Sequence, residues 1–262
     1  IMERKIGCSI TGIGDIQNAF QAGFNYVEVR GRDLVEYTEA EFKKLVKETI
    51  RYNMPVLGVN AYCSPKLQIV GASYNKDIIR SHAQICASRT AELGTKYIGI
   101  GSPNSRNITK NYSRKRAESQ FIEFLSLTAE EFNQYGIWIC VEPLAPCYCN
   151  FINTIQEAVE IVNSLSIDNI GIVADLYNME KTNEPLNTLD YCINYIKHAH
   201  LSDDEGSPDK RFFLKPEKRV VHQNKIRSLY EKGYKGNLTL EIDCKIQLDK
   251  AKETLEIIRG AF

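Results

Sequence analysis

The sequence predicts an α/β protein, a single-domain (β/α)8 TIM barrel over residues 1–262, and three observations support this prediction. The chain has 262 residues, which is close to the usual length of one such barrel. Eight short apolar runs alternate with longer amphipathic ones, so a helical pattern follows each predicted strand. No linker, composition shift or low-complexity tract divides the chain.

The predicted elements alternate along the whole chain. The strands are all short and lie at 5–10, 26–30, 55–59, 97–101, 137–142, 170–175, 196–201 and 238–242. Helices are predicted at 15–22, 42–52, 77–93, 116–135, 154–165, 189–195, 224–230 and 248–260. Capping boxes begin at Thr38 and Thr154, where a hydroxyl and a glutamate satisfy free backbone N–H groups at a helix start. Gly94 and Gly233 lie where glycine commonly ends a helix.

A doubly wound open sheet is the alternative fold. It would normally show a glycine-rich phosphate-binding turn after an early strand. The first turn of this chain has Gly12 and Gly14 but lacks the third glycine of that pattern. The segments after the fourth to seventh strands are also long, whereas the segments that return into strands are short. In a barrel the long segments would share the C-terminal face, where active sites are built.

The composition excludes several classes of protein. Hydrophobic residues make up 43% and charged residues 25% of the chain, which is ordinary for a globular domain. The 33 Lys and Arg balance the 33 Asp and Glu, and because nucleic-acid binding normally needs a basic excess, no nucleic-acid partner is expected. The apolar runs are strand-sized, which predicts no membrane span. Eight scattered cysteines and no visible secretory signal predict a cytoplasmic protein with reduced thiols.

The predicted strands direct polar side chains toward the inside of the barrel. Side chains alternate between the two faces of a strand, and a barrel strand must be apolar toward its helices. In 137–142 the odd-numbered positions are aliphatic, so Glu142 turns inward at the strand end. The same alternation turns Asp175 and Glu241 inward and gives His198 and His200 one common face. Four strands therefore direct a carboxylate or an imidazole toward one mouth of the barrel.

These side chains predict a divalent metal site. Carboxylates that converge in a closed barrel are costly, because burial and mutual repulsion both oppose their charges. A divalent cation removes that cost. Three carboxylates and one imidazole form a mixed oxygen and nitrogen ligand set, which suits manganese, magnesium, cobalt or zinc.

Other polar residues near the strand ends are candidates for contact with a substrate. Glu28 and Arg30 end the second strand with both side chains inward, where they either pair with each other or contact substrate. Asn60 follows the third strand and could hydrogen-bond a polyol, and Tyr148 is one of several aromatic residues expected around the mouth. A turn with two glycines after the fourth strand, followed by Arg106, is either a phosphate-binding turn or an ordinary one.

Four motifs occur along the chain in a characteristic order: Val-Glu-Pro-Leu at 141–144, Val-Ala-Asp-Leu-Tyr-Asn at 173–178, Lys-His-Ala-His-Leu-Ser-Asp at 197–203, and Gly-Tyr-Lys-Gly at 233–236 before Leu240 and Glu241. Through this ordered set, nearly the whole chain resembles the xylose-isomerase-like superfamily of TIM barrels. This sugar-phosphate isomerase and epimerase group includes relatives of the ketose 3-epimerases and inosose dehydratases. The resemblance implies that His198 is a neighbour and that the metal ligands are Glu142, Asp175, His200 and Glu241.

The resemblance also implies a mechanism and catalytic residues. In the ketose 3-epimerase branch, the metal binds two adjacent substrate oxygens, and two glutamates exchange a proton with the carbon between them from opposite faces. Glu142 and Glu241 would fill these roles here. The chemistry is consistent, because a cation that polarises a carbonyl makes the neighbouring C–H acidic, and a carboxylate on each side supplies the base and the acid.

Three positions depart from that branch. Asn178 stands where a histidine commonly follows the metal aspartate, Tyr148 where a glutamate often lies, and Gly206 where an arginine often follows the metal histidine. These positions grip substrate in the sugar epimerases, so the departures weaken the expectation of activity on a free ketose, though not that of metal binding. Asn178 and Tyr148 stay candidate substrate-binding residues. Arg211 could reach back to replace the missing arginine, and the alternative is a salt bridge to Asp203.

Together these features predict a metal-dependent isomerase or epimerase that abstracts a proton next to the carbonyl of a small carbohydrate. The first alternative is a lyase or dehydratase that acts on a keto-inositol or keto-glycoside at the same site. The second is a non-catalytic barrel that retains the metal. The nucleases of the superfamily use three zinc ions and need more than the four histidines of this chain. Superfamily members are often dimers or tetramers, so a homo-oligomer is expected.

Overall fold

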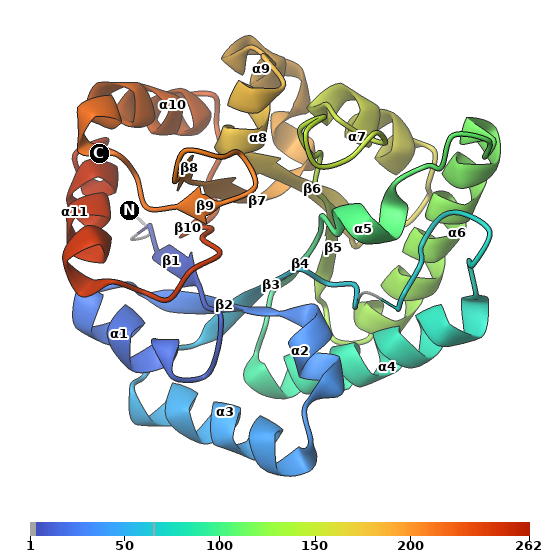
Figure 1. Ribbon diagram of the computed structural model, residues 1–262, viewed down its shortest axis with the longest axis horizontal. Coiled ribbons are helices and arrows are strands. Elements are labelled where there is room, and N and C mark those ends of the chain that lie inside the picture. The colour runs from blue at the N-terminus through green and yellow to red at the C-terminus, as the bar shows by residue number, and fades with distance from the viewer. Residues whose placement is uncertain (1–3, 65) are drawn as a thin grey trace.

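Eight parallel strands close a barrel at the centre of the molecule, and helices surround it (Figure 1). The structure is a computed structural model that describes residues 4–64 and 66–262. Around the barrel the strands follow the order β1-β10-β7-β6-β5-β4-β3-β2. Their bounds are β1 (Ile6–Ser9), β2 (Tyr26–Arg30), β3 (Val56–Asn60), β4 (Tyr97–Ile100), β5 (Trp138–Val141), β6 (Ile170–Asp175), β7 (Ile196–Leu201) and β10 (Leu238–Leu240). The predicted TIM barrel is confirmed.

The helices lie outside the strands, and both predicted capping boxes, at Thr38 and Thr154, are present. Their bounds are α1 (Asp15–Ala22), α2 (Gly31–Glu36), α3 (Glu39–Arg51), α4 (Lys76–Leu93), α5 (Pro103–Arg106), α6 (Arg114–Asn133), α7 (Ile155–Asn163), α8 (Leu176–Lys181), α9 (Leu189–Cys192), α10 (Arg219–Glu231) and α11 (Leu248–Arg259). The short helices α2, α5 and α8 were not expected from the sequence. Each follows the C-terminal end of a barrel strand and so helps to form the mouth.

The long segment after β7 contains a small hairpin that the sequence analysis did not predict. Its two antiparallel strands are β8 (Asp203–Asp204) and β9 (Arg211–Phe212), and Asp204 lies opposite Arg211. The hairpin returns Arg211 to the barrel mouth. The remaining short elements are the 3-10 helices η1 (Leu186–Thr188), η2 (Ile193–Tyr195) and η3 (Pro216–Lys218). The helix expected at 189–195 is therefore only one turn of α-helix that continues as η2.

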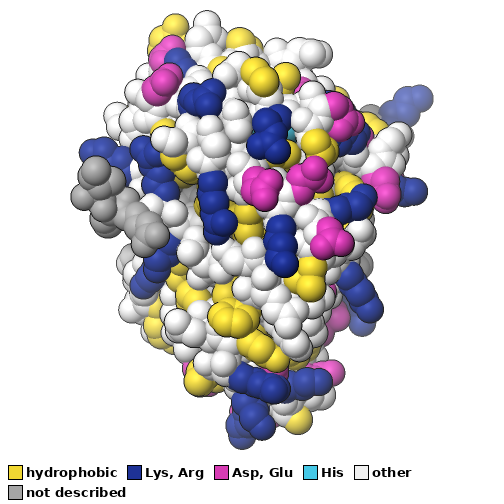
Figure 2. All heavy atoms as spheres, turned by 90° about the vertical axis from the view of Figure 1, so that its left-hand side faces the viewer, with side chains coloured by type: hydrophobic (Ala, Val, Ile, Leu, Met, Phe, Trp, Pro, Cys, Tyr) yellow, Lys and Arg dark blue, Asp and Glu magenta, His cyan; other side chains and the backbone are white. Residues whose placement is uncertain are grey.

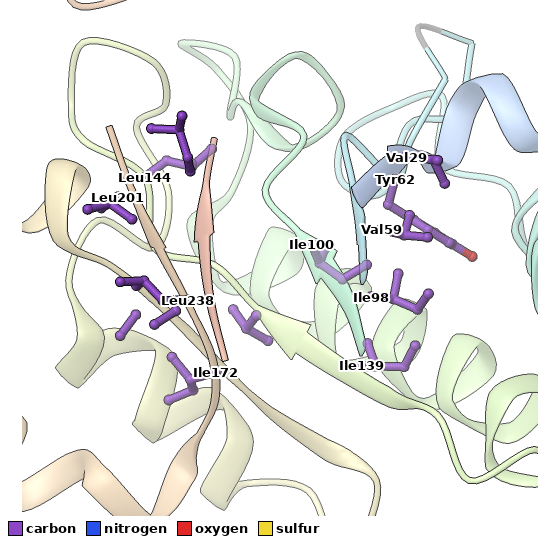
Figure 3. Close-up of a cluster of buried hydrophobic side chains, with 14 of the residues drawn as sticks. Val29, Val59, Tyr62, Ile98, Ile100, Ile139, Leu144, Ile172, Leu201 and Leu238 are labelled. Atoms are coloured by element: carbon purple, nitrogen blue, oxygen red, sulfur yellow. The ribbon is translucent and has the colours of Figure 1, made fainter. Parts of the chain in front are cut away.

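The alternation of side chains divides the core into two parts. The main cluster includes aliphatic side chains of the barrel strands, several of which are seen in Figure 3, among them Val59, Ile98, Ile139 and Ile172. A separate small cluster consists of the intervening side chains Tyr97, Cys140 and Val173. The next residues of the same parity are Gly99, Glu142 and Asp175. The parity argument is thus confirmed, because the strand-end carboxylates continue the inner set.

Charged and hydrophobic side chains alternate over the face of the molecule seen in Figure 2. Lys and Arg side chains are interspersed there with Asp and Glu, and the hydrophobic areas between them are small. Within the described residues, every helix is either too short or too polar to cross a bilayer.

Candidate metal centre

The four residues expected to bind metal meet at the C-terminal mouth of the barrel. Glu142 follows β5, Asp175 ends β6, His200 lies in β7 and Glu241 follows β10. Each offers one possible ligand atom, and these atoms all lie within 4.8 Å of one another. His200 Nδ1 is 3.1 Å from Glu142 Oε1 and 3.6 Å from Glu241 Oε2. The geometric condition for a shared ion is therefore met.

The barrel topology explains this convergence. Strands β5, β6, β7 and β10 are consecutive neighbours around the barrel, so side chains at their ends share one half of the mouth. Asp175 and His200 also lie directly opposite each other in the β6–β7 register. Gly101 provides space, because a Cβ atom there would lie 2.6 Å from Glu142 Oε2.

Asp175 is held by the start of α8. Its carboxylate accepts hydrogen bonds from the backbone N–H of Tyr177 at 2.8 Å and of Asn178 at 3.3 Å, and from the Asn178 side-chain amide at 3.1 Å. Asn178 is almost completely buried. It therefore orients Asp175, and its expected contact with substrate stays a prediction.

Glu28, which is buried inside the barrel, orients the His200 ring. Glu28 Oε2 lies 3.1 Å from His200 Nε2, and Glu28 Oε1 accepts a hydrogen bond from Thr239 Oγ1 at 2.6 Å and contacts His198 Nε2. A carboxylate beside Nε2 favours a proton there, so Nδ1, which faces Glu142 and Glu241, is the nitrogen that a cation would take in exchange for its proton.

Glu28 is fully buried in this network and does not reach the cavity. This position corrects both hypotheses for Glu28. Its carboxylate contacts His198, His200 and Thr239, and neither substrate nor Arg30. Gly58 leaves the space that Glu28 occupies, because a Cβ there would lie 2.7 Å from Glu28 Oε1. Glu28, His198 and His200 form a second group with metal-compatible spacing. We interpret it as a hydrogen-bonded support, because Thr239 and the two imidazoles already surround the carboxylate.

The centre carries more negative charge than its neighbours neutralise. Burial, followed by the Glu142 carboxylate, raises the pKa of Glu241 to about 8. Burial opposes a charge on His200, but Glu28 and Glu241 outweigh burial and raise the pKa of His200 well above 6.5. Both shifts show a site that favours added positive charge. Three carboxylates and an Nδ1 lone pair therefore fit a divalent cation such as manganese, magnesium, cobalt or zinc.

Arg211 reaches back to this centre, as one of the two sequence hypotheses expected. Its Nη2 donates to Asp175 Oδ2 at 2.7 Å and lies 3.1 Å from Glu241 Oε2. Its Nε donates to Ser202 Oγ. The alternative, a salt bridge with Asp203, is wrong in this structure, because Asp203 binds other partners.

Asp203 ties the end of β7 to the following helices. It accepts hydrogen bonds from His222 Nε2 at 2.6 Å, Lys218 Nζ at 2.8 Å and the backbone N–H of Lys215 at 2.9 Å. Burial alone would raise its pKa, but the hydrogen bonds from His222 and Lys218 outweigh burial and lower the pKa to about 2.

We expect Asp203→Asn to lower the free energy of unfolding at pH 7 by about 2 kcal/mol. Because the folded pKa, about 2, lies below the ordinary value of 3.8, Asp203 stabilises the folded state above about pH 4, and this stabilisation is lost as the pH falls toward the folded value. Urea unfolding at pH 7 and pH 3 measures this, and the difference between wild type and variant should shrink at pH 3. An equal difference at both pH values contradicts the prediction. Asp168→Asn, at an exposed loop position, is the matched control.

A cavity of about 590 Å³ opens over the centre, and Glu142 and Glu241 form part of its wall. Of the expected substrate-binding residues, the ones that line it are Arg30, Asn60, Tyr148 and Arg211. Asn60 Nδ2 also donates to Glu241 Oε1 at 3.3 Å. The sequence analysis missed lining residues that lie beyond the strand ends, among them Arg32 and Asn104. Strand parity does not extend into α2 and α5, where these residues lie.

Arg106 does not serve the turn after β4 as a phosphate ligand. It is fully buried, and its guanidinium donates to the carbonyl oxygens of Ile100 at 3.1 Å, Glu142 at 2.8 Å and Ile152 at 3.2 Å. The phosphate-binding interpretation of Arg106 is therefore wrong. Its contact with the Glu142 carbonyl instead fixes the backbone that carries this candidate ligand.

Comparison with known proteins gives consistent results. Residues 16–261 match the model of a family described as xylose isomerase-like TIM barrel. The inosose isomerase of Halalkalibacterium halodurans is 25% identical over 240 residues, which covers 88% of this chain and 82% of that protein. The inosose isomerase of Bacillus subtilis is 24% identical over 215 residues, which covers 79% of this chain and 72% of that protein.

Solved structures show the same fold at lower identity. A 3-keto-D-glucoside 4-epimerase from E. coli superposes with a TM-score of 0.78 at 16% identity, covering 98% of this chain and 100% of that one. A D-psicose 3-epimerase crystallised in the presence of D-fructose has a TM-score of 0.77 at 17% identity, with coverage of 98% and 96%.

Proposed function

The chain belongs to the xylose isomerase-like TIM-barrel family, and from this premise we propose that it is a divalent-metal-dependent isomerase or epimerase. Its substrate is a small polyhydroxylated ketone, and its reaction moves a proton at the carbon next to the carbonyl. The observation that carries this proposal is the meeting of Glu142, Asp175, His200 and Glu241 at the barrel mouth, directly below a cavity that Glu142 and Glu241 line.

The arrangement of the two glutamates supports proton transfer on two sides of a substrate. Glu142 follows β5 and Glu241 follows β10, and these strands flank β6 and β7 in the barrel. One carboxylate can therefore take a proton from one face of a carbon while the other, in its protonated form, gives a different proton to the opposite face. When bound, a divalent cation polarises the carbonyl and makes the adjacent C–H acidic.

The surrounding residues suit a polyol. Arg211 and Asn60 contact Glu241 and also line the cavity, so each can orient this carboxylate and offer an N–H group to a substrate oxygen. A cavity of about 590 Å³ lies in the range that takes small ligands. The curated relatives are named inosose isomerases, which makes a keto-inositol the first compound to test.

The test is hydrogen exchange in deuterium oxide with a panel of inososes and ketoses. We expect deuterium to enter at a carbon next to the carbonyl while its hydroxyl is kept, and NMR or mass spectrometry measures this. A chelator should abolish exchange, and titration with manganese, magnesium, cobalt or zinc should restore it. Exchange that persists at full rate in apoprotein, verified by elemental analysis, contradicts the metal-dependent proposal.

The same experiment separates the alternative functions. Loss of water or of a glycosidic leaving group would identify a lyase, because isomerase and lyase share only the proton-abstraction step. Absence of exchange with the whole panel in metal-loaded protein would favour the non-catalytic barrel.

Cellular location and assembly stay predictions. All eight cysteines lie in the described residues as free thiols, and the cytoplasmic location is checked by cell fractionation. A homo-oligomer is checked by light scattering.

A further inference from the structure

The cavity over the metal centre has two halves of opposite character. The four candidate ligands come from β5, β6, β7 and β10, which form one half of the barrel rim. The other half is formed by β1 to β4, and there Arg30 and Arg32 line the same cavity as Glu142 and Glu241. The proposed metal and proton-transfer chemistry uses only the first half.

Arg30 lies beside a residue that contacts the centre. It is the last residue of β2 and lies opposite Asn60 of β3 in the strand register, so the two side chains share the inward face. Asn60 in turn donates to Glu241. Neighbouring strands are about 4.8 Å apart, so Arg30 begins one strand beyond the residue that contacts the centre. A small sugar skeleton bound at the centre could extend toward it.

A rigid turn presents the two arginines. A Cβ atom on Gly31 would lie 2.8 Å from the Cα of Tyr62, so only glycine allows this close approach of α2 to the end of β3. The backbone N–H of Arg32 donates to the carbonyl of Ala61 at 3.2 Å. The backbone that carries both guanidinium groups is thus packed against β3, which limits the entropy lost when a ligand binds.

The fold leaves most of this positive charge without a partner. Among the described residues, no carboxylate forms an ion pair with the half-buried Arg30, although Asp33 lies in its vicinity. Arg32 has one ion pair, to Asp33 at 3.7 Å, with side-chain exposures of 37% and 31%, and such an exposed pair is weak. Asp209 and Asp243 also line the cavity, but both are exposed and neither pairs with these arginines.

We propose that the substrate carries an anionic group, a carboxylate or a phosphate ester, on the part of its skeleton remote from the reacting carbonyl, and that Arg30 and Arg32 bind it. This inference rests on the proposed function and specifies its substrate class. A planar guanidinium matches carboxylate and phosphate oxygens and forms charge-assisted hydrogen bonds with them. A neutral polyol would leave Arg30 without such a partner.

The test compares ligands that share one skeleton. Metal-loaded protein is titrated by calorimetry with D-fructose, D-fructuronate and D-fructose 6-phosphate, and with inorganic phosphate as the simplest anion. We expect at least one sugar anion to bind about tenfold or more tightly than D-fructose. Comparison of D-fructuronate with D-fructose 6-phosphate shows whether the site prefers a carboxylate or a phosphate ester.

The arginine variants assign that preference to its residues. Arg30→Gln should reduce the preference for the anionic sugar to less than about threefold, and Arg32→Gln should reduce it partly. Arg80→Gln, at an exposed position on α4 that pairs with Glu130, is the matched control. Circular dichroism checks the fold of each variant.

Three results would overturn the inference: equal binding of the neutral and anionic sugars, no binding of any anion, or a preference that survives in Arg30→Gln. Each can occur while deuterium exchange with a neutral inosose succeeds. The proposed isomerase function would then stand although the anion site fails. Conversely, if anionic sugars bind but no ketone exchanges deuterium, the anion site at Arg30 and Arg32 would stand and the proposed isomerase reaction would be contradicted.

Discussion

Glu241→Gln is expected to lower the rate of deuterium exchange into substrate by about 10³-fold. The amide keeps the size of the side chain but cannot accept a proton, and Glu241 is placed between His200, Arg211 and the cavity. NMR measures the exchange rate at saturating metal, and elemental analysis of each sample separates loss of proton transfer from loss of the ion.

Glu253→Gln is the matched control, because Glu253 is exposed on α11 and the same chemical change there should leave exchange unaltered. An exchange rate in Glu241→Gln within about threefold of the wild-type rate would refute the role of Glu241 as a general base, since a positioned base contributes far more than that. Circular dichroism must show that the variant is folded.

His200→Ala is expected to weaken divalent-metal affinity by more than about 100-fold. The substitution removes the sole nitrogen donor of the group and leaves the fully buried Glu28 with fewer partners. Affinity is measured by competition with a chelator of known metal affinity. Wild-type affinity in a folded His200→Ala protein would refute the assigned ligand set.

Glu28→Gln should weaken metal affinity less than His200→Ala does. Glu28 does not line the cavity over the centre, and we expect it to act only through the Nε2 proton of His200, so the loss in metal affinity should be smaller, about 10- to 100-fold. Burial would raise the pKa of Glu28, but His200 and His198 outweigh burial and hold it well below 4.5. Nitrogen-15 NMR of the histidine ring should show a changed tautomer balance in the variant. An unchanged tautomer and unchanged affinity would leave Glu28 with a packing role alone.

The barrel could be predicted because its signals are local. Each strand and helix has its own periodicity, and the capping boxes at Thr38 and Thr154 need only four residues each. Alternation along single strands was enough to turn Glu142, Asp175 and Glu241 inward. Short helices such as α2 and α8 were missed, because six residues at a strand end carry no clear period.

The supporting contacts of the site could not be predicted in the same way. Strand parity shows that Glu28 faces inward, but it does not show the depth at which a side chain stops. Glu28 is 172 positions from His200 in the sequence, and Asn178 and Arg106 also proved to be buried supports. Their roles depend on which polar groups need a partner once water is excluded.

The sequence by itself predicted the barrel and the inward direction of Glu142, Asp175, Glu241 and the histidine pair, because strand order and the two-residue alternation of side chains are properties of neighbouring residues; the choice of His200 over His198 came from the family resemblance. Only the tertiary structure decided which nitrogen of His200 faces the centre, where the β8–β9 hairpin places Arg211, and that Arg30 and Arg32 share a cavity with Glu142 and Glu241. The physical reason is that these features arise from contacts between distant segments, and closure of the barrel creates those contacts.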